Sequence, residues 1–263
     1  MNKKIAGPVI DTHVHLNQEI PGPAANAAKV LNDELERSGV EKAIVLHLAF
    51  QRWSLEEVAE AINEHERLIG FVNIHPDEDD AKSLLSHAVG ELKFRGLKLH
   101  PRLMNHDIDG PNSVDLVRHA GRLGLPVIIC GFPDGDWMMQ GSTALKYANL
   151  ARACPNTRII VAHMGGHHVL DFMMLAKRIP NMYFDTSYTL LYYRGSAVIQ
   201  NITYAMRSMR FKKIFYGSDY PDRSVKDTVD GSYVLLREYG LNEDEIVKIL
   251  YTNAKEFLDW MGV

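Results

Sequence analysis

The residues best suited to chemistry lie near the N-terminus, where two histidines stand two positions apart in Asp11-Thr12-His13-Val14-His15. This stretch follows the apolar run Pro8-Val9-Ile10, which is typical of a strand. On an extended chain, side chains two residues apart point to the same face. Two imidazoles on one face suit a metal ion, but a His-x-His pair also occurs by chance. The interpretation therefore depends on the rest of the chain.

Further side chains able to bind a metal or carry a proton stand near the ends of later apolar runs. In an α/β barrel the carboxyl ends of the strands meet at one mouth, where active sites form. The gathering of these side chains at strand ends therefore predicts a metal or acid–base site at that mouth. The residues in question are His47, His75, Lys98, His100, Cys130, His163, Asp185 and Asp219.

We predict that His13, His15, His163 and Asp219 form this site. Imidazole and carboxylate groups are good ligands for Zn²⁺, Mn²⁺ or Fe²⁺, of which we expect Zn²⁺. Such an ion lowers the pKa of a bound water from about 15.7 to near 7 and polarises a carbonyl. Asp219 is the candidate to take the proton from that water and return it to a leaving group.

Several of these side chains also have a structural interpretation. His47 and His75 fit supporting roles near the site better than direct ones. Lys98 and His100 share one face of a strand and are candidates for substrate binding, although Lys98 could instead form an ion pair with Asp219 or Asp185. Asp185 could simply accept hydrogen bonds from the loop that follows it.

Short strands alternate with amphipathic helices along the whole chain. The predicted strands are Val9–His15, Lys42–Leu48, Leu68–Ile74, Gly96–His100, Pro126–Gly131, Arg158–His163, Met182–Thr186 and Lys213–Asp219. The predicted helices are Ala25–Ser38, Leu55–Arg67, Asp77–Phe94, Ser113–Leu123, Ser142–Ala153, His167–Ile179, Ala197–Met209, Val225–Tyr239 and a final helix from Glu243 through Leu250 toward Trp260. Spacings typical of helix caps occur at Ser54 with Glu57 and at Asn242.

This alternation predicts an α/β protein with a closed (β/α)8 TIM barrel, a single domain over residues 1–263 and an extra C-terminal helix. An open Rossmann-like sheet is the main competitor, but no Gly-x-Gly-x-x-Gly follows the first strand. A length of 263 residues is ordinary for one barrel.

Composition excludes several classes of function. The net charge is −4 and no basic block stands out, so binding to nucleic acid or to a membrane surface is not expected. The chain shows no secretory signal, no apolar run long enough to span a membrane, and only two cysteines, Cys130 and Cys154. We therefore expect a cytoplasmic protein that acts on a small molecule.

At these residues the sequence resembles the amidohydrolase superfamily of metal-dependent TIM-barrel enzymes. Within it, the sequence is most similar to the branch that contains aminocarboxymuconate-semialdehyde decarboxylase and the pyrone-dicarboxylate lactonases. The resemblance runs from the first strand to the last helix. The similar stretches are Asp11-Thr12-His13-Val14-His15, Gly96-Leu97-Lys98-Leu99-His100-Pro101, Ala162-His163-Met164-Gly165-Gly166, Gly217-Ser218-Asp219-Tyr220-Pro221 and Thr252-Asn253-Ala254-Lys255-Glu256-Phe257-Leu258.

The resemblance implies that His13 and His15 bind the metal and that Asp219 is both a ligand and the proton carrier. It also implies that His163 binds the metal or orients the reacting water or substrate. Where the branch has a metal-binding histidine at the end of the fifth strand, this sequence has Cys130. Cys130 could itself be a ligand, or His163 or His100 could complete the set, and one metal is favoured over two.

The expected activity is that of a metal-dependent hydrolase acting on a lactone, amide or ester. A decarboxylase of an unsaturated acid on the same site is the nearest alternative. A metal-free barrel with a binding role and a Schiff-base enzyme using Lys98 are two others. An acidic substrate and a homodimer are also expected. The acidic-substrate expectation rests on cations near the predicted mouth, which are Arg52, Lys98, Arg102, Arg194 and Arg223.

Overall fold

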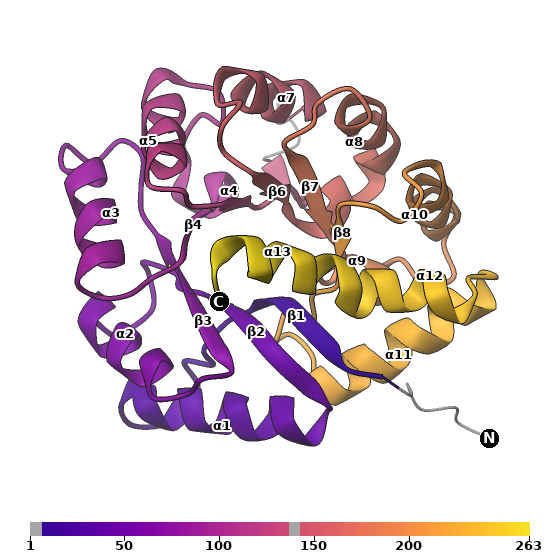
Figure 1. The fold of residues 1–263 in the computed structure, drawn as a ribbon, viewed down its shortest axis with the longest axis horizontal. Coiled ribbons are helices and arrows are strands. Elements are labelled where there is room, and N and C mark those ends of the chain that lie inside the picture. The colour runs from indigo at the N-terminus through magenta and orange to yellow at the C-terminus, as the bar shows by residue number, and fades with distance from the viewer. Residues whose placement is uncertain (1–6, 137–142) are drawn as a thin grey trace.

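A computed structural model describes residues 7–136 and 143–263, which form one sheet of eight parallel strands with neighbours in chain order (Figure 1). This arrangement confirms the predicted TIM barrel. The strands are β1 Val9–Val14, β2 Val40–Leu46, β3 Leu68–Asn73, β4 Gly96–Leu99, β5 Val127–Ile129, β6 Ile159–Val161, β7 Met182–Asp185 and β8 Ile214–Phe215.

Hydrogen bonds between β1 and the chain after β8 bring the two ends of the sheet together. The Thr12 backbone N–H donates to the Tyr216 carbonyl at 2.9 Å, and that of His15 donates to the Tyr220 carbonyl at 2.8 Å. Because β8 itself has only two residues, this pairing past its end holds the first and last strands in register.

The helices follow the predicted order, with most ends shifted by a few residues. The predicted first residue of the helix Ser142–Ala153 lies outside the described residues. The short helical segments Pro101–Met104, Ala162–His168 and Thr189–Tyr192 follow strands at the mouth, and they were not predicted apart from His167 and His168 at the end of the second. The helices are α1 Ala24–Arg37, α2 Leu55–Asn63, α3 Ala81–Gly90, α4 Pro101–Met104, α5 Pro111–Arg122, α7 Ala144–Ala153, η1 Ala162–His168, α8 Val169–Ala176, α9 Thr189–Tyr192, α10 Ala197–Ser208, α11 Val225–Glu238, α12 Glu243–Val247, η2 Lys248–Thr252 and α13 Asn253–Met261.

The strand side chains divide into two apolar layers. Val14 and Leu99 pack in the large cluster between barrel and helices, as their alternation with His13, His15, Lys98 and His100 predicts. The second cluster fills the barrel interior with residues such as Ile44 and Ile160. The polar side chains at the strand ends therefore point inward above a closed apolar floor.

The C-terminal segment covers the end of the barrel opposite the mouth. In Figure 1, α13 lies across the front of the barrel, and Phe257 and Leu258 join the interior cluster. Asn242 and Glu245 form a complete capping box at the start of α12. The Ser54 cap also forms, but the Glu57 carboxylate bonds the backbone of Ala24 rather than completing a box.

Two further expectations concern the membrane and the cysteines. Among the described residues, none of the helices combines the length and the apolar character needed to cross a bilayer. Cys130 and Cys154 are both free and buried.

Candidate metal centre at the barrel mouth

Three of the predicted ligands meet at the mouth. The Nε2 atoms of His13 and His15 lie 3.3 and 3.5 Å from Oδ1 of Asp219. In the described chain, these three side chains form the one group of His, Cys, Asp or Glu whose ligand atoms all lie within 4.8 Å of one another. His13 is almost fully buried, whereas His15 and Asp219 are 14% and 18% exposed, so the group opens toward the cavity.

The other ring nitrogen of each histidine is held by an acceptor. His13 Nδ1 donates to the Asp185 carboxylate at 3.0 Å, and His15 Nδ1 donates to the Leu46 carbonyl at 2.8 Å. A proton on Nδ1 leaves Nε2 with a free lone pair. Both Nε2 atoms therefore face Asp219 in the form that binds a metal, and metal-binding histidines in proteins are commonly supported in this way.

Backbone contacts between the first and last strands position the three ligands. The Asp219 N–H donates to the His13 carbonyl at 2.9 Å, and the Ser218 N–H donates to the buried Asp11 carboxylate at 3.0 Å. Gly217 lies so close to His13 that an added Cβ would approach the histidine Cβ within 2.8 Å. The Asp11-x-His13 and Gly217-Ser218-Asp219 stretches thus interlock at the mouth.

The protonation states of His13 and Asp219 also favour a cation. Burial is the main reason that the pKa of His13 falls to about 4, so its imidazole is neutral at pH 7. Burial alone would raise the pKa of Asp219, but His13 and His15 outweigh it and hold this pKa below its usual range. The carboxylate is therefore charged.

The donor set fits a divalent metal ion. Two ligands each 2.0 to 2.1 Å from a tetrahedral Zn²⁺ are about 3.3 Å apart. The two N–O separations of 3.3 and 3.5 Å match that spacing. Two imidazoles and a carboxylate are also ligands that Zn²⁺, Mn²⁺ and Fe²⁺ accept.

His163 and Cys130 lie beside this group rather than in it. The His163 ring centroid is 5.0 Å from that of His13, and its Nδ1 donates to the Ser187 carbonyl at 3.0 Å. The Cys130 thiol hydrogen-bonds with both His163 and His100. Metal binding by His163 and by Cys130 stays a prediction, since neither belongs to the close three-residue group.

The protonation states of His163, Cys130 and His100 depend on one another. Burial alone would lower the pKa of His163, but its hydrogen bond to Cys130 and the nearby charges raise it to about 9. Burial alone would raise the pKa of the Cys130 thiol, but His100 and His163 bring it well below its ordinary value. Cys130 thus favours a proton on His163, next to the three ligands.

The remaining predicted side chains have more peripheral places. Lys98 is 1% exposed, and burial lowers its pKa. The described residues contain no ion pair of Lys98 with Asp185 or Asp219, although both carboxylates act on its charge. His47 accepts from the Asn73 N–H at 3.3 Å, and His75 bonds the Met104 carbonyl at 2.7 Å, which agrees with supporting roles.

A cavity of about 310 Å³ opens above the three ligands. One wall is aromatic, where Phe132 packs edge-on against Tyr188 at 5.1 Å and against His163 at 5.6 Å. Leu48, Leu103 and a single arginine also line the cavity. The cavity is lined by His13, His15, Leu48, His100, Arg102, Leu103, Phe132, Asp134, His163, Tyr188, Asp219 and Asp222.

Of the five cations expected at the mouth, one arginine lines this cavity. Arg102 pairs with Asp134 at 3.0 Å, and its Nε finds no partner among the described residues. Arg194 instead pairs with Glu238 at 3.0 Å, and Arg223 lies 3.6 Å from Asp222. The remaining arginine, Arg52, donates to backbone carbonyls and stacks on a tryptophan ring.

Two contributors go beyond the expectations from the sequence, which limited Asp185 to accepting hydrogen bonds from the loop that follows it and did not single out Ser187. Asp185 accepts from His13 and also from the backbone N–H groups of His163 and Ser187, both at 3.0 Å. Ser187 Oγ lies 3.0 Å from His13 Nδ1 and 2.9 Å from His163 Nδ1. Asp185 and Ser187 are two residues apart, as His13 and His15 are, so the same alternation in the sequence could have indicated that both face the site. The aromatic wall lies on loops and had no comparable signal.

Comparisons with known proteins agree with this geometry. A family model described as Amidohydrolase (Amidohydro_2) matches residues 10–260. A search of curated proteins gave no significant match. An uncharacterized TIM-barrel protein from Bordetella bronchiseptica superposes with a TM-score of 0.79 at 18% identity, covering 97% of this chain and 100% of the other.

Two further structures have assigned or probable activities. A probable 2-pyrone-4,6-dicarboxylic acid hydrolase from Acinetobacter baumannii with citric acid bound gives a TM-score of 0.70 at 16% identity over 100% of both chains. The 5-carboxyvanillate decarboxylase from Novosphingobium aromaticivorans, complexed with manganese and a nitrobenzoic acid, gives 0.64 at 15% identity, covering 99% of this chain and 97% of the other. Since the family model spans nearly the whole sequence, the chain belongs to the amidohydrolase family.

Proposed function

We propose that the protein is a metal-dependent hydrolase of a lactone, amide or ester carbonyl in a small acidic molecule. The observation that carries the proposal is the convergence of His13 Nε2, His15 Nε2 and the Asp219 carboxylate beneath the cavity. These three residues would hold one divalent ion, Zn²⁺ being our first expectation. When bound, the ion would supply Lewis-acid activation of a water and of the substrate carbonyl.

The chain's own residues supply the remaining steps. Asp219 has a carboxylate that is charged and partly exposed to the cavity, so it can accept a proton there and return it to a leaving group. His163 is fixed by its Nδ1 bond to Ser187 and can donate a hydrogen bond to a substrate oxygen. The aromatic wall of Phe132 and Tyr188 excludes water and favours a flat substrate.

Arg102 is our candidate for binding an acidic group on that substrate. It lines the cavity, its side chain is 27% exposed, and its pairing with Asp134 uses one terminal nitrogen. A carboxylate can therefore approach the rest of the guanidinium group. His100 lines the same cavity and could contribute a second contact, whereas Lys98 is buried below it.

The second candidate is a decarboxylase acting on an unsaturated or aromatic acid. The similarity to the manganese-bound 5-carboxyvanillate decarboxylase and the aromatic wall of the cavity favour it. A binding protein without metal is disfavoured because the ligand atoms of His13, His15 and Asp219 converge within 4.8 Å of one another. A Schiff base on Lys98 is disfavoured because this amine does not line the cavity.

Product analysis separates the two main candidates. The purified protein, loaded with Zn²⁺ or Mn²⁺, would be incubated with pyrone-dicarboxylate lactones and with carboxylated phenols in ¹⁸O-labelled water. Label in a new carboxylic acid identifies the hydrolase, and released CO₂ identifies the decarboxylase. Asp219→Asn is the inactive control, and Arg102→Ala should raise KM about ten-fold or more for acidic substrates. Absence of both products over the whole panel would argue against either activity.

A further inference from the structure

A second cavity lies at the end of the barrel away from the metal centre. Its volume is about 460 Å³, compared with about 310 Å³ at the mouth. It lies between the residues that begin β6, β7 and β8 and the C-terminal segment formed by η2 and α13. Its lining comprises Arg158, Tyr183, Arg210, Lys212, Lys213, Phe215, Lys248, Thr252, Asn253, Glu256 and Phe257.

Five of these lining side chains are basic and one is acidic, in a chain whose net charge is −4. Many other basic residues of the described chain form ion pairs with carboxylates, including Lys82, Lys146 and Arg194. Within residues 7–136 and 143–263, none of the five cavity cations forms an ion pair. Like charges gathered around one concavity repel each other unless an anion neutralises them.

Two of these cations are held in place without any carboxylate. The Arg158 guanidinium lies 3.8 Å from the centroid of the Trp260 ring and also faces Tyr183 at 5.8 Å. Lys213 Nζ donates to the Pro180 carbonyl at 2.5 Å and lies 5.5 Å from the Tyr183 ring. Aromatic rings and carbonyls orient a cation but leave its full charge available to a ligand.

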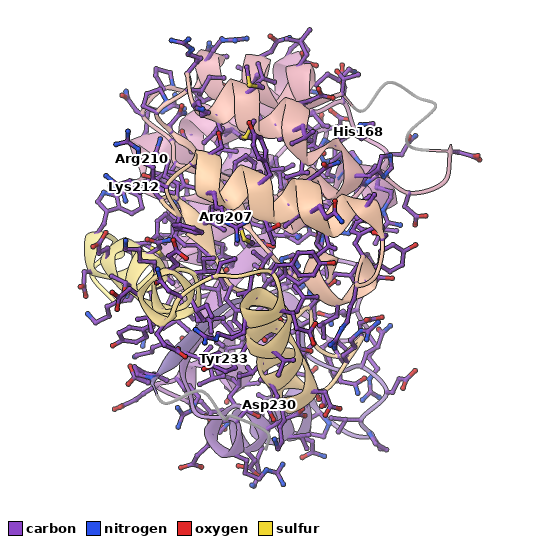
Figure 2. The ribbon with its side chains drawn as sticks, turned by 90° about the vertical axis from the view of Figure 1, so that its right-hand side faces the viewer. His168, Arg207, Arg210, Lys212, Asp230 and Tyr233 are labelled. Atoms are coloured by element: carbon purple, nitrogen blue, oxygen red, sulfur yellow. The ribbon has the colours of Figure 1, made fainter. Side chains whose placement is uncertain are left out.

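The loop between α10 and β8 presents its basic side chains at an energetic cost. Arg210, Phe211 and Lys213 have φ values of 56°, 57° and 61°, in the left-handed region that favours glycine. Figure 2 shows Arg210 and Lys212 at the edge of the molecule beside the yellow C-terminal helices. Asn253 fixes this loop by donating to the Phe211 and Ile214 carbonyls, both at 2.7 Å.

The opposite wall is irregular as well. Lys248 and Thr252 bound the π-helical turn η2, and such turns often occur at functional sites. The C-terminal dipole of α10 favours basic residues just after that helix, but Lys248 lies within a continuous helical segment and Arg158 precedes a strand. Helix dipoles therefore do not explain why five basic side chains surround this cavity.

We propose that this cavity, defined by Arg158, Arg210, Lys212, Lys213 and Lys248, binds a small ligand bearing phosphate groups. Phosphate is multivalent and accepts hydrogen bonds from both Arg and Lys, which suits several cations around one space. The volume is that of a small-molecule site. The site is separate from the metal centre and independent of the proposed reaction.

Isothermal titration of the whole protein at fixed ionic strength tests the proposal, with inorganic phosphate, pyrophosphate and adenosine monophosphate as separate probes. Lys212 and Lys248 are both exposed, so the double variant Lys212→Glu/Lys248→Glu should fold normally. It should bind the best probe about ten-fold or more weakly. Lys93→Glu, an exposed lysine away from the cavity, is the matched control and should stay within about two-fold of wild type.

A third variant separates the two ends of the barrel. Arg102→Ala removes the arginine at the mouth and should leave phosphate binding unchanged. If Arg102→Ala abolishes binding while the double lysine variant keeps it, the ligand binds at the mouth and the proposal is wrong. Absence of binding of all three probes to wild type would also overturn it. If the double Glu variant is unfolded by circular dichroism, Lys212→Ala/Lys248→Ala replaces it, with the same direction expected. The probe that binds most tightly shows whether the site prefers a free phosphate ion, as in inorganic phosphate or pyrophosphate, or a phosphate ester, as in adenosine monophosphate.

Discussion

His13 Nδ1 lies 3.0 Å from Oδ2 of Asp185, a carboxylate with no exposed surface that lies 172 residues later in the sequence. Burial alone would raise the pKa of Asp185, but His13 and other donors hold it below its usual range, so the carboxylate is charged. This contact fixes the tautomer of His13 and makes its Nε2 a stronger donor toward a metal.

Asp185→Asn is therefore expected to weaken metal binding by about 10- to 100-fold, because supporting carboxylates contribute that much to metal affinity. The variant keeps the shape and most hydrogen bonds of the buried side chain. Competition with a chromophoric chelator measures Zn²⁺ affinity. The exposed Asp79→Asn should bind as wild type does. Equal affinity in Asp185→Asn and wild type would show that the contact is only structural.

Metal content distinguishes the ligands from their neighbours. We expect close to one Zn²⁺ or Mn²⁺ per chain in wild type and almost none in His13→Ala or Asp219→Ala. Cys130→Ser and His100→Gln should retain the metal, since the close group contains neither side chain. Elemental analysis after gel filtration gives the content. Loss of metal in Cys130→Ser would instead make the thiol a ligand, replacing the histidine that the resemblance implies at this position.

Much of this arrangement could be predicted because it depends on alternation along strands. His13 and His15 share a face, and Val14 packs outward as that alternation requires. The contact between Asp219 and His13 also follows from barrel closure, which brings the last strand beside the first. The parts that were missed depend on contacts between side chains that are far apart in the sequence. No local pattern reveals that Asp185 faces His13, or that Arg194 turns to Glu238 instead of the mouth.

The closeness of Gly217 to His13 predicts the effect of one added methyl group. The new Cβ in Gly217→Ala would lie 2.8 Å from the His13 Cβ and 2.9 Å from that of Ser187, and both neighbours are buried. Overpacking of this kind costs about 1 to 3 kcal/mol and should displace His13. We expect a lower free energy of unfolding in urea and a lower Zn²⁺ affinity.

Gly90→Ala is the matched control for that substitution. Gly90 is in α3, and an added Cβ there meets no atom within 4 Å. Alanine is the better helix former by roughly 0.5 to 1 kcal/mol, so this variant should be as stable as wild type or slightly more stable. Equal stability and equal metal affinity in Gly217→Ala and Gly90→Ala would mean that the first strand can shift freely.

Acid sensitivity should arise in part from His106, which lies outside the metal centre. Burial is the main cause that lowers its pKa to about 4, and its Nε2 has no partner among the described residues. In the unfolded chain this pKa is about 6.5, so the unfolded state binds the proton first as pH falls. The contribution of neutral His106 to stability is complete above about pH 6.5 and is lost as pH falls toward 4, up to about 3 kcal/mol.

His106→Gln removes this titration and should reduce the fall in the free energy of unfolding between pH 7 and pH 4. Urea denaturation at half-unit intervals of pH measures the slope. The exposed His87→Gln is the control and should keep the wild-type slope. His75 and Asp77 also act on the charge of His106, so the double variant His75→Gln/His106→Gln tests whether they share the effect. An unchanged slope in His106→Gln would show that His106 titrates in the folded protein as it does in the unfolded chain, because a group with equal proton binding in both states leaves stability independent of pH.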